Sequence, residues 1–248
     1  MQDNIRITMK ETIDKEKMLD KNVGKISAMF DSIAPSYDKL NHILSFGVDK
    51  SWRRKLLRRV KNAGAHRVLD LACGSGDVSI ALNKAGFEVV GADISNGMLD
   101  IARQKSAGAI VFVWGDAAHL PFESASFDAV TISFGIRNFD KLDECVREIC
   151  RVLKPGGSLH VLEFGIPSNR LWRAMYTFYS RHILPTIGRL ISGDKGAYTY
   201  LPESTFNFPY GDDFINKVIS YSQGDNGFQR SDMRRLSGGI AYLYTLYK

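Results

Sequence analysis

The segment Val68–Asp77, VLDLACGSGD, is the most informative part of this 248-residue chain. Val68–Leu71 is a short apolar run typical of a buried strand, and a glycine-rich turn and a helix-like pattern follow it. A glycine-rich turn between a strand and a helix lets a ligand approach the backbone at the carboxyl end of the strand. The stretch therefore predicts the first strand–turn–helix unit of a Rossmann-like α/β sheet, with a ligand above it.

Strand and helix patterns alternate after this unit. The strand-like runs are 67–72, 87–94, 110–117, 127–134 and 158–164. Helix-like runs at 95–108 and 142–153 lie among them, and the turn Lys154–Gly157 is expected to close the second. Such alternation is typical of a parallel sheet covered by helices on both faces. The last two runs, 228–236 and 239–247, resemble a hairpin, so we expect at least one antiparallel strand.

One domain with appended segments accounts for the length of the chain. Residues 1–25 are expected to form a polar N-terminal arm, and residues 26–248 a single domain. Within that domain, residues 26–61 are expected to form a helical region on the substrate or membrane side. Residues 165–210, which are rich in aromatics and arginine, are expected to form a lid-like helical insertion after the fifth strand.

Composition narrows the class of protein. The formal net charge of +6 and the pI of about 9.2 favour an anionic partner, whether nucleic acid, an acidic membrane or an anionic small molecule. No apolar run is long enough to span a bilayer, and the N-terminus lacks the apolar stretch of a signal peptide. The cysteines and histidines show no metal-ligand spacing. We therefore expect a cytoplasmic protein with free thiols and no metal.

Acidic residues at the strand ends indicate the class of ligand. Asp70 ends the first strand and Asp77 opens the next helix, and two carboxylates beside the turn would repel a pyrophosphate. They suit a ligand that carries an ammonium group and a sulfonium, although Asp77 is also an ordinary N-cap residue. Asp93 ends the second strand, where it can hold ribose hydroxyls, and Gly115–Ala117 end the third, beside the adenine edge. These positions predict S-adenosylmethionine as the cofactor.

The end of the fourth strand, TISFGIRNF at 131–139, is expected to face the transferred methyl group. Methyltransferases that act on amines of bases commonly have Asn or Asp, two prolines and an aromatic residue here. Their absence argues against adenine or glutamine N-methylation. Arg137 and Asn138 are suited to bind an oxygen anion. The spacing is equally consistent with an ion pair between Arg137 and a surface acid.

Four longer stretches carry a resemblance to a known family. They are YDKLNHILSFGVDKSW (37–52), LDLACGSGD (69–77), TISFGIRN (131–138) and RVLKPGGSLHVLEF (151–164), with AYTYLPES and the ending GIAYLYTLYK also similar. From about Met29 to Lys248 the chain resembles the UbiE/MenG family of menaquinone and ubiquinone biosynthesis C-methyltransferases. Asp49 stands where this family often has His, and Gly165 where it often has Ser, so a catalytic histidine at the first position is not carried over.

The resemblance implies a class I S-adenosylmethionine-dependent methyltransferase with a mostly parallel sheet, an antiparallel C-terminal strand and a helical insertion after strand 5. It implies C-methylation of demethylmenaquinol to menaquinol in menaquinone biosynthesis. The alternatives are C-methylation of a methoxy-benzoquinol ubiquinone precursor, another small-molecule methylation, RNA methylation, and a non-catalytic cofactor-binding module. The predicted cofactor contacts are Asp70, Gly74, Ser75, Gly76, Asp93, Asp116, Ala117 and Ser133. The predicted acceptor side consists of Tyr37, Asp38, Asn41, Arg137 and Asn138.

Roles for the acceptor-side residues follow from their chemistry. Arg137, with Asn138, is predicted to stabilise the ring oxygen as it becomes anionic. Because arginine stays protonated, the ring proton is expected to leave to a carboxylate or to a water positioned by Asp38. The expected partner is a prenylated demethylmenaquinol rather than a nucleic acid. The oligomeric state stays open, with a homo-oligomer among the alternatives.

A prenylated acceptor resides in a membrane, so we expect a peripheral location on its inner face. In residues 50–61 the apolar Trp52, Leu56 and Val60 recur every four residues among seven Lys and Arg. This pattern predicts either a helix that docks on an anionic membrane surface or a core stripe with a solvated basic face. The insertion 165–210 is expected either to contact the prenyl tail or to form a plain helical cap.

Overall fold

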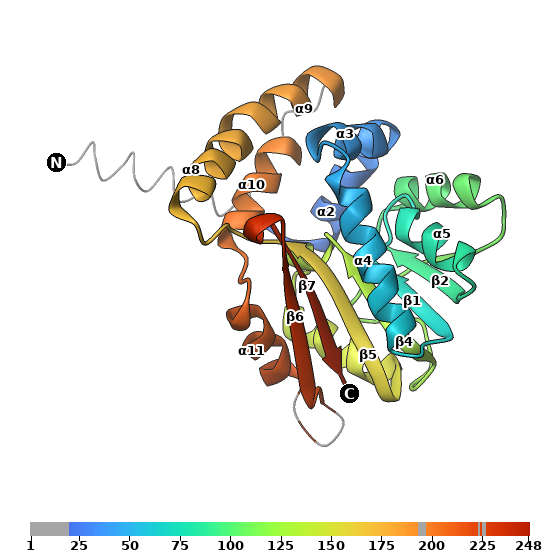
Figure 1. Cartoon of the computed structure of the whole chain (residues 1–248). Coiled ribbons are helices and arrows are strands. Elements are labelled where there is room, and N and C mark those ends of the chain that lie inside the picture. The colour runs from blue at the N-terminus through green and yellow to red at the C-terminus, as the bar shows by residue number, and fades with distance from the viewer. Residues whose placement is uncertain (1–19, 193–196, 223, 225–226) are drawn as a thin grey trace, which may run out of the picture.

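The computed structural model describes residues 20–192, 197–222, 224 and 227–248. Its centre is a seven-stranded sheet with the strand order β3-β2-β1-β4-β5-β7-β6 (Figure 1). The strands are β1 (Arg67–Leu71), β2 (Glu88–Asp93), β3 (Val111–Trp114), β4 (Phe127–Ser133), β5 (Leu153–Phe164), β6 (Arg230–Leu236) and β7 (Ala241–Tyr247). Strands β1 to β5 pair in parallel, and β7 is antiparallel to both β5 and β6. The predicted fold class and the C-terminal hairpin are confirmed.

The expected turn at 154–157 is wrong. Helix α7 (Leu142–Val152) passes directly into β5, which begins at Leu153 and contains the Lys-Pro-Gly-Gly segment. A Cβ atom on Gly157 would lie 3.0 Å from the Asp128 carbonyl oxygen, so the glycine permits a close approach to β4. The pairing of β4 with β5 shifts register between Phe127 and Ala129. The segment is therefore the irregular start of a strand.

Helices cover both faces of the sheet. The remaining helices of eight or more residues are α2 (Val23–Ile33), α3 (Tyr37–Leu44), α4 (Val48–Asn62), α5 (Asp77–Lys84), α6 (Asn96–Ser106), α8 (Arg170–Phe178), α9 (Leu184–Ser192), α10 (Ala197–Asn207) and α11 (Asp212–Tyr221). Leu82 of α5 and Leu99 of α6 are buried in the core of one face, whereas Val146 of α7 and Phe214 of α11 are buried in that of the other. The apolar stripes of α5, α6, α7 and α11 thus pack against the strands.

Helix α4 lies on the sheet, and its apolar stripe belongs to the core. Trp52 is 5% exposed, and Leu56 and Val60 are fully buried. Two of its basic residues are held in ion pairs, Arg53 with Asp77 and Arg59 with Asp232. The membrane-docking reading of this stripe is therefore wrong, because its apolar side chains pack against β-strands and cannot reach a lipid surface.

A helical cap stands at the carboxyl end of the parallel strands. Figure 1 shows α2 and α3 gathered there with α8, α9 and α10 from the insertion. The two parts share a small core in which Leu40 and Leu44 of α3 are buried together with Leu184 of α9 and Ala197 of α10. None of the described helices is long and apolar enough to cross a bilayer.

The predicted division of the chain stays a prediction. Residues 1–19 of the proposed arm lie outside the described residues, and α2 begins at Val23, before the expected boundary at residue 26. The described residues of the insertion at 165–210 include α8, a π-helical turn (Tyr179–Ile183), α9 and α10.

We predict that Gly91→Ala destabilises the fold. A Cβ atom on Gly91, in β2, would lie 2.4 Å from the Phe112 ring, and overpacking of this kind costs about 1–3 kcal/mol of unfolding free energy. Chemical denaturation measures the loss. A second substitution, Phe112→Leu, is expected to recover part of it in the Gly91→Ala background, and equal stabilities of the Gly91→Ala variant and the wild type would contradict the prediction.

Candidate active site

Three neighbouring cavities lie between the sheet and the helical cap. Cavity A has a volume of about 280 Å³, cavity B of about 110 Å³ and cavity C of about 430 Å³. Tyr37 and Ser133 line both A and B, while Trp52 and Phe164 line both B and C. The cavities are therefore adjacent, and they run in sequence from the strand ends to the insertion.

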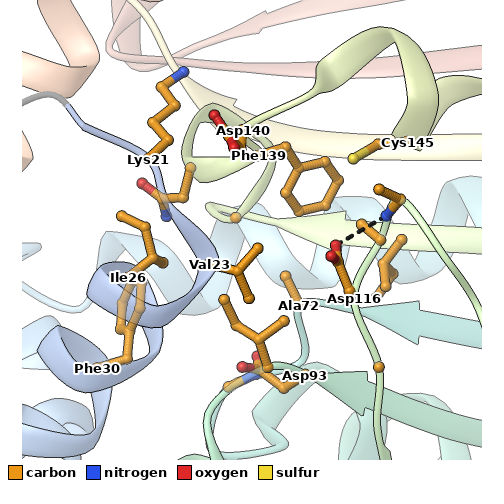
Figure 2. Close-up of a pocket in the computed structure, with 18 of the residues that line it drawn as sticks. Lys21, Val23, Ile26, Phe30, Ala72, Asp93, Asp116, Phe139, Asp140 and Cys145 are labelled. Atoms are coloured by element: carbon orange, nitrogen blue, oxygen red, sulfur yellow. Dashed lines mark hydrogen bonds between the residues drawn. The ribbon is translucent and has the colours of Figure 1, made fainter.

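Cavity A collects the acidic residues from two neighbouring strand ends. Figure 2 shows Asp93 and Asp116 facing it, as predicted. The Asp93 carboxylate accepts hydrogen bonds from the Gly74 amide at 2.8 Å and the Ser95 amide at 2.9 Å. Burial raises the pKa of Asp93, and these hydrogen bonds partly offset that shift. Parallel strands end at one edge, which is why residues far apart in sequence meet there.

Around Asp116, cavity A combines a carboxylate with apolar walls. Asp116 accepts a hydrogen bond from the Ala118 amide at 3.0 Å, and Ala117 lines the same cavity. Figure 2 places Phe139 on one side, and Val23 and Ile26 of α2 on the other. A flat, apolar group with a polar edge, such as a nucleobase, suits this part of the cavity.

Gly74 and Gly76 of the turn have different structural roles. Gly74 has a φ of +54° and lines cavities A and B, where a Cβ atom would come no closer than 3.8 Å to Tyr37. Gly76 has a φ of +81° and lines none of the three cavities, and its Cβ atom would lie 2.9 Å from that of Ala102. Gly76 therefore serves the packing of the turn against α6, while Gly74 leaves room for a ligand.

Asp70 is a buried carboxylate at the wall of cavity B. It accepts hydrogen bonds from Ser79 Oγ at 2.6 Å and Thr131 Oγ1 at 2.7 Å. Burial is the largest influence and raises the pKa of Asp70 to about 6, although both hydroxyl groups act in the opposite direction. Around neutral pH the group is an anion in a poorly solvated position, which favours a cationic partner.

Asp77 does not contribute a free negative charge to the turn. Its carboxylate forms ion pairs with Arg53 of α4 and Lys105 of α6, and both partners lie far from it in sequence. The expectation that Asp77 helps to repel a pyrophosphate is therefore wrong, because its charge is compensated. The preference of this site for a cationic ligand therefore depends on Asp70 and Asp93.

Asp38 belongs to the same network. Its carboxylate accepts hydrogen bonds from Ser75 Oγ and, at 2.7 Å, from Lys105 Nζ. Asp38 lines none of the three cavities, whereas Ser75 lines cavity B. The role of Asp38 beside the acceptor stays a prediction, and its observed contacts hold α3 against the turn.

Arg137 is 6% exposed and is paired inside the protein. Its Nη1 atom lies 2.9 Å from Glu163 Oε1 and also donates to the Phe134 carbonyl oxygen. The guanidinium group stands 5.5 Å from the centre of the Phe164 ring. Arg137 therefore pairs with a buried acid and not with the surface acid considered above, and it lines cavity B as a rigidly held cation.

The acceptor-side residues surround cavity B only in part. Tyr37 and Asn41 line it and are hydrogen-bonded to each other, and burial raises the pKa of Tyr37. Asn138 instead lines cavity A and accepts a hydrogen bond from the Tyr200 hydroxyl at 3.0 Å. Phe134 stacks on Phe164 at a centroid distance of 4.4 Å. Aromatic walls and a fixed cation suit a planar, oxygen-bearing ring.

Ser133 marks the junction of cavities A and B. It is the last residue of β4, and its buried Oγ has no hydrogen-bond partner among the described residues. A buried hydroxyl group without a partner is costly, so this atom fits a polar ligand atom at the junction. No group of three His, Cys, Asp or Glu in the described part of the chain is arranged to hold a metal ion.

Two side chains of the site, Glu163 and Tyr200, are not among the residues predicted from the sequence. Glu163 is the penultimate residue of β5, and the same reasoning that selected acids at strand ends would have selected it. Tyr200 lies in the quoted AYTYLPES segment, but nothing local indicates its contact with Asn138, which is 62 residues away. Both residues fix the two polar groups expected to bind an acceptor oxygen.

The chain is similar to known methyltransferases in sequence and in fold. The chain is 42% identical to a demethylmenaquinone methyltransferase of Bacteroides fragilis, over 92% of this chain and 94% of that protein. It is 44% identical to the ubiquinone/menaquinone biosynthesis C-methyltransferase UbiE of Syntrophotalea carbinolica, over 88% and 91%. A SAM-dependent methyltransferase from Thermotoga maritima shares the fold with a TM-score of 0.61 at 18% identity, over 89% and 99%. The family match spans residues 16–248, and the chain belongs to the ubiE/COQ5 methyltransferase family.

Proposed function

We propose that this chain transfers a methyl group from S-adenosylmethionine to a ring carbon of demethylmenaquinol, giving menaquinol and S-adenosylhomocysteine. The observation that carries the proposal is the junction of cavities A and B, where Ser133 and Tyr37 line both. A cofactor in cavity A and a quinol in cavity B would meet there. The names of the relatives at 42% and 44% identity support this acceptor.

The residues of cavity A fit the cofactor. Asp93 has the position and the charge to hold both ribose hydroxyl groups. Asp116 has the position and the charge to hold the adenine edge. Asp70, at the wall of cavity B beside Gly74, suits the ammonium group of the methionyl part. When bound, the cofactor supplies a methyl group that its sulfonium already activates. The protein holds the methyl group of the cofactor toward the acceptor and excludes water. Alignment of this kind lowers the activation barrier of methyl transfer by about 7–11 kcal/mol at best.

The residues of cavity B orient the quinol. Arg137 lies at its wall with a fixed guanidinium group, and it favours the anionic form of the ring oxygen. Phe134 and Phe164 hold the ring plane. A carboxylate or a water takes the ring proton. Asp49, a buried residue that lines the cavity and accepts a hydrogen bond from Ser45 Oγ at 2.8 Å, is a candidate for this role beside Asp38.

Cavity C suits the prenyl tail. It adjoins cavity B at Trp52 and Phe164, and the insertion supplies Tyr176, Tyr179 and Leu184 to its wall. In this proposal the insertion is the lid over the tail, and the protein works at a membrane surface as a peripheral enzyme.

The test is incubation of the full chain with methyl-labelled S-adenosylmethionine and demethylmenaquinol in detergent, followed by mass analysis of the quinol. The expected product carries one labelled methyl group on the ring carbon. A parallel incubation with the methoxy-benzoquinol precursor of ubiquinone asks whether the enzyme accepts both. An unlabelled demethylmenaquinol after long incubation, with label on any other acceptor, would contradict the proposal.

Cofactor binding is predicted to weaken below about pH 6. The pKa of Asp70 is about 6 in the folded chain, and its protonated form cannot pair with the ammonium group. The affinity for S-adenosylmethionine should therefore have its full value above this pH and fall by up to about tenfold per pH unit below it. Calorimetric titration with S-adenosylmethionine between pH 7 and 5 measures the slope. Asp70→Asn is expected to bind more weakly at pH 7 with a shallower slope, and an unchanged slope in this variant would contradict the assignment.

A further inference from the structure

Helix α8 carries large apolar side chains that stay exposed on the folded protein. It contains Leu171, Trp172, Met175 and Phe178, yet none of its nine residues is buried. A helix on a globular protein normally turns an apolar stripe toward the core. The spacing of Leu171, Met175 and Phe178 places these three on one side of the helix. In Figure 1, α8 lies at the outer edge of the cap, away from the sheet.

The exposed apolar residues of the protein gather around this helix. The described residues contain ten large apolar side chains classed as exposed, and seven of them lie on α8, on the π-helical turn after it, or on the segment that begins α4. These seven are Phe46, Val48, Leu171, Trp172, Met175, Phe178 and Ile183, and we call them the α8 face. The Phe46 ring lies 5.9 Å from that of Tyr179, which joins the two segments. Patches of this kind mark interaction sites.

The part of the insertion that carries α8, residues 165–192, has charged side chains of one sign. Residues 165–192 contain four arginines and one histidine, and no aspartate or glutamate. Arg170, Arg173 and Arg181 are exposed. Arginines beside an exposed apolar stripe form the pattern of helices that lie in a lipid headgroup region. Basic residues near an anionic leaflet strengthen binding to it.

The α8 face is continuous with cavity C. Phe46, Val48, Trp172 and Met175 belong to the face and also line the cavity. The cavity therefore opens between exposed apolar side chains, and a long apolar chain could enter it from a lipid phase without crossing water. Docking of a soluble partner protein on the α8 face would not explain why cavity C opens there.

We propose that the α8 face docks on an anionic lipid bilayer and presents the mouth of cavity C to it. The inference rests on the proposed function for the identity of the molecule that enters, a membrane-resident quinol. It places the docking surface on the insertion and on Phe46 and Val48 at the start of α4, whereas the stripe of Trp52, Leu56 and Val60 lies in the core.

The experiment is co-sedimentation of the full chain with vesicles of phosphatidylcholine, alone or with phosphatidylglycerol, without cofactor or acceptor. The variant Leu171→Ser/Phe178→Ser removes side chains that are 72% and 60% exposed and line none of the cavities. Val111→Ser is the matched control, since Val111 is 63% exposed at the start of the edge strand β3. The wild type and the control are expected to bind the anionic vesicles, and the double variant at least about tenfold more weakly, because two apolar side chains leave the lipid.

Equal binding by the double variant and the wild type would overturn the proposal, as would a wild type that binds neither kind of vesicle. Sedimentation velocity adds a second outcome. If the double substitution turns an oligomer into a monomer without changing vesicle binding, the α8 face is an interface between copies of this chain. Methylation of detergent-solubilised demethylmenaquinol by the wild type tests the proposed function separately. The double variant is expected to retain that activity in detergent, because its cavities are unchanged.

Discussion

Arg137→Ala is expected to lower kcat for demethylmenaquinol by about 100- to 1,000-fold, the loss typical of removing one preorganised donor to a developing oxyanion. Arg137 is the cation at the wall of cavity B, and its ion pair with Glu163 keeps it in place. The affinity for S-adenosylmethionine should change much less than kcat, because Arg137 does not line cavity A, where the ribose and adenine of the cofactor are proposed to lie. Steady-state kinetics with demethylmenaquinol and calorimetry with the cofactor separate the two effects.

The removal of Arg137 also leaves Glu163 as an unpaired buried charge, which costs about 3–5 kcal/mol of unfolding free energy. The double variant Arg137→Gln/Glu163→Gln removes both charges and keeps the chain testable. Arg151→Ala is the matched control, because Arg151 forms an ion pair with Glu148 on α7 and lines none of the cavities. A folded double variant that methylates at a near wild-type rate would exclude Arg137 from the reaction.

Ser180→Phe is expected to lower kcat/KM by about 100-fold for an acceptor with a long prenyl tail and to leave an acceptor with one prenyl unit almost unchanged. Ser180 is buried in the π-helical turn and lines cavity C, so a phenyl ring there takes the space of the tail. Each methylene group that loses its burial costs about 0.8 kcal/mol, so three or four of them account for the expected factor.

Ser180→Ala is the control for this second prediction, since it removes the hydroxyl group and leaves the cavity open. Initial rates with acceptors of increasing tail length measure the effect. If Ser180→Phe slows short and long acceptors equally, cavity C does not bind the tail and the substitution acts on the ring site. If it slows neither acceptor, the tail lies elsewhere.

Local sequence was sufficient for most of the fold. The run Val68–Leu71, the turn after it and the acids at Asp93 and Asp116 are short-range patterns, and a parallel sheet brings its strand ends to one edge whatever the loops do. The boundary of β5 was not predictable in this way. The Lys-Pro-Gly-Gly segment at 154–157 has the composition of a turn, and only its pairing with β4 makes it part of a strand.

The α/β sheet, the glycine-rich turn and the group of strand-end residues could be predicted from the sequence, because they depend on neighbours along the chain. Which charges are compensated depends on contacts between distant segments. Asp77 is neutralised by Arg53 and Lys105, and Arg137 by Glu163, which is 26 residues away. The tertiary structure also buried the apolar stripe of α4 and exposed that of α8. An apolar stripe or a charge has the same local pattern in either situation, and only the elements folded against it determine whether it meets protein, ligand or solvent.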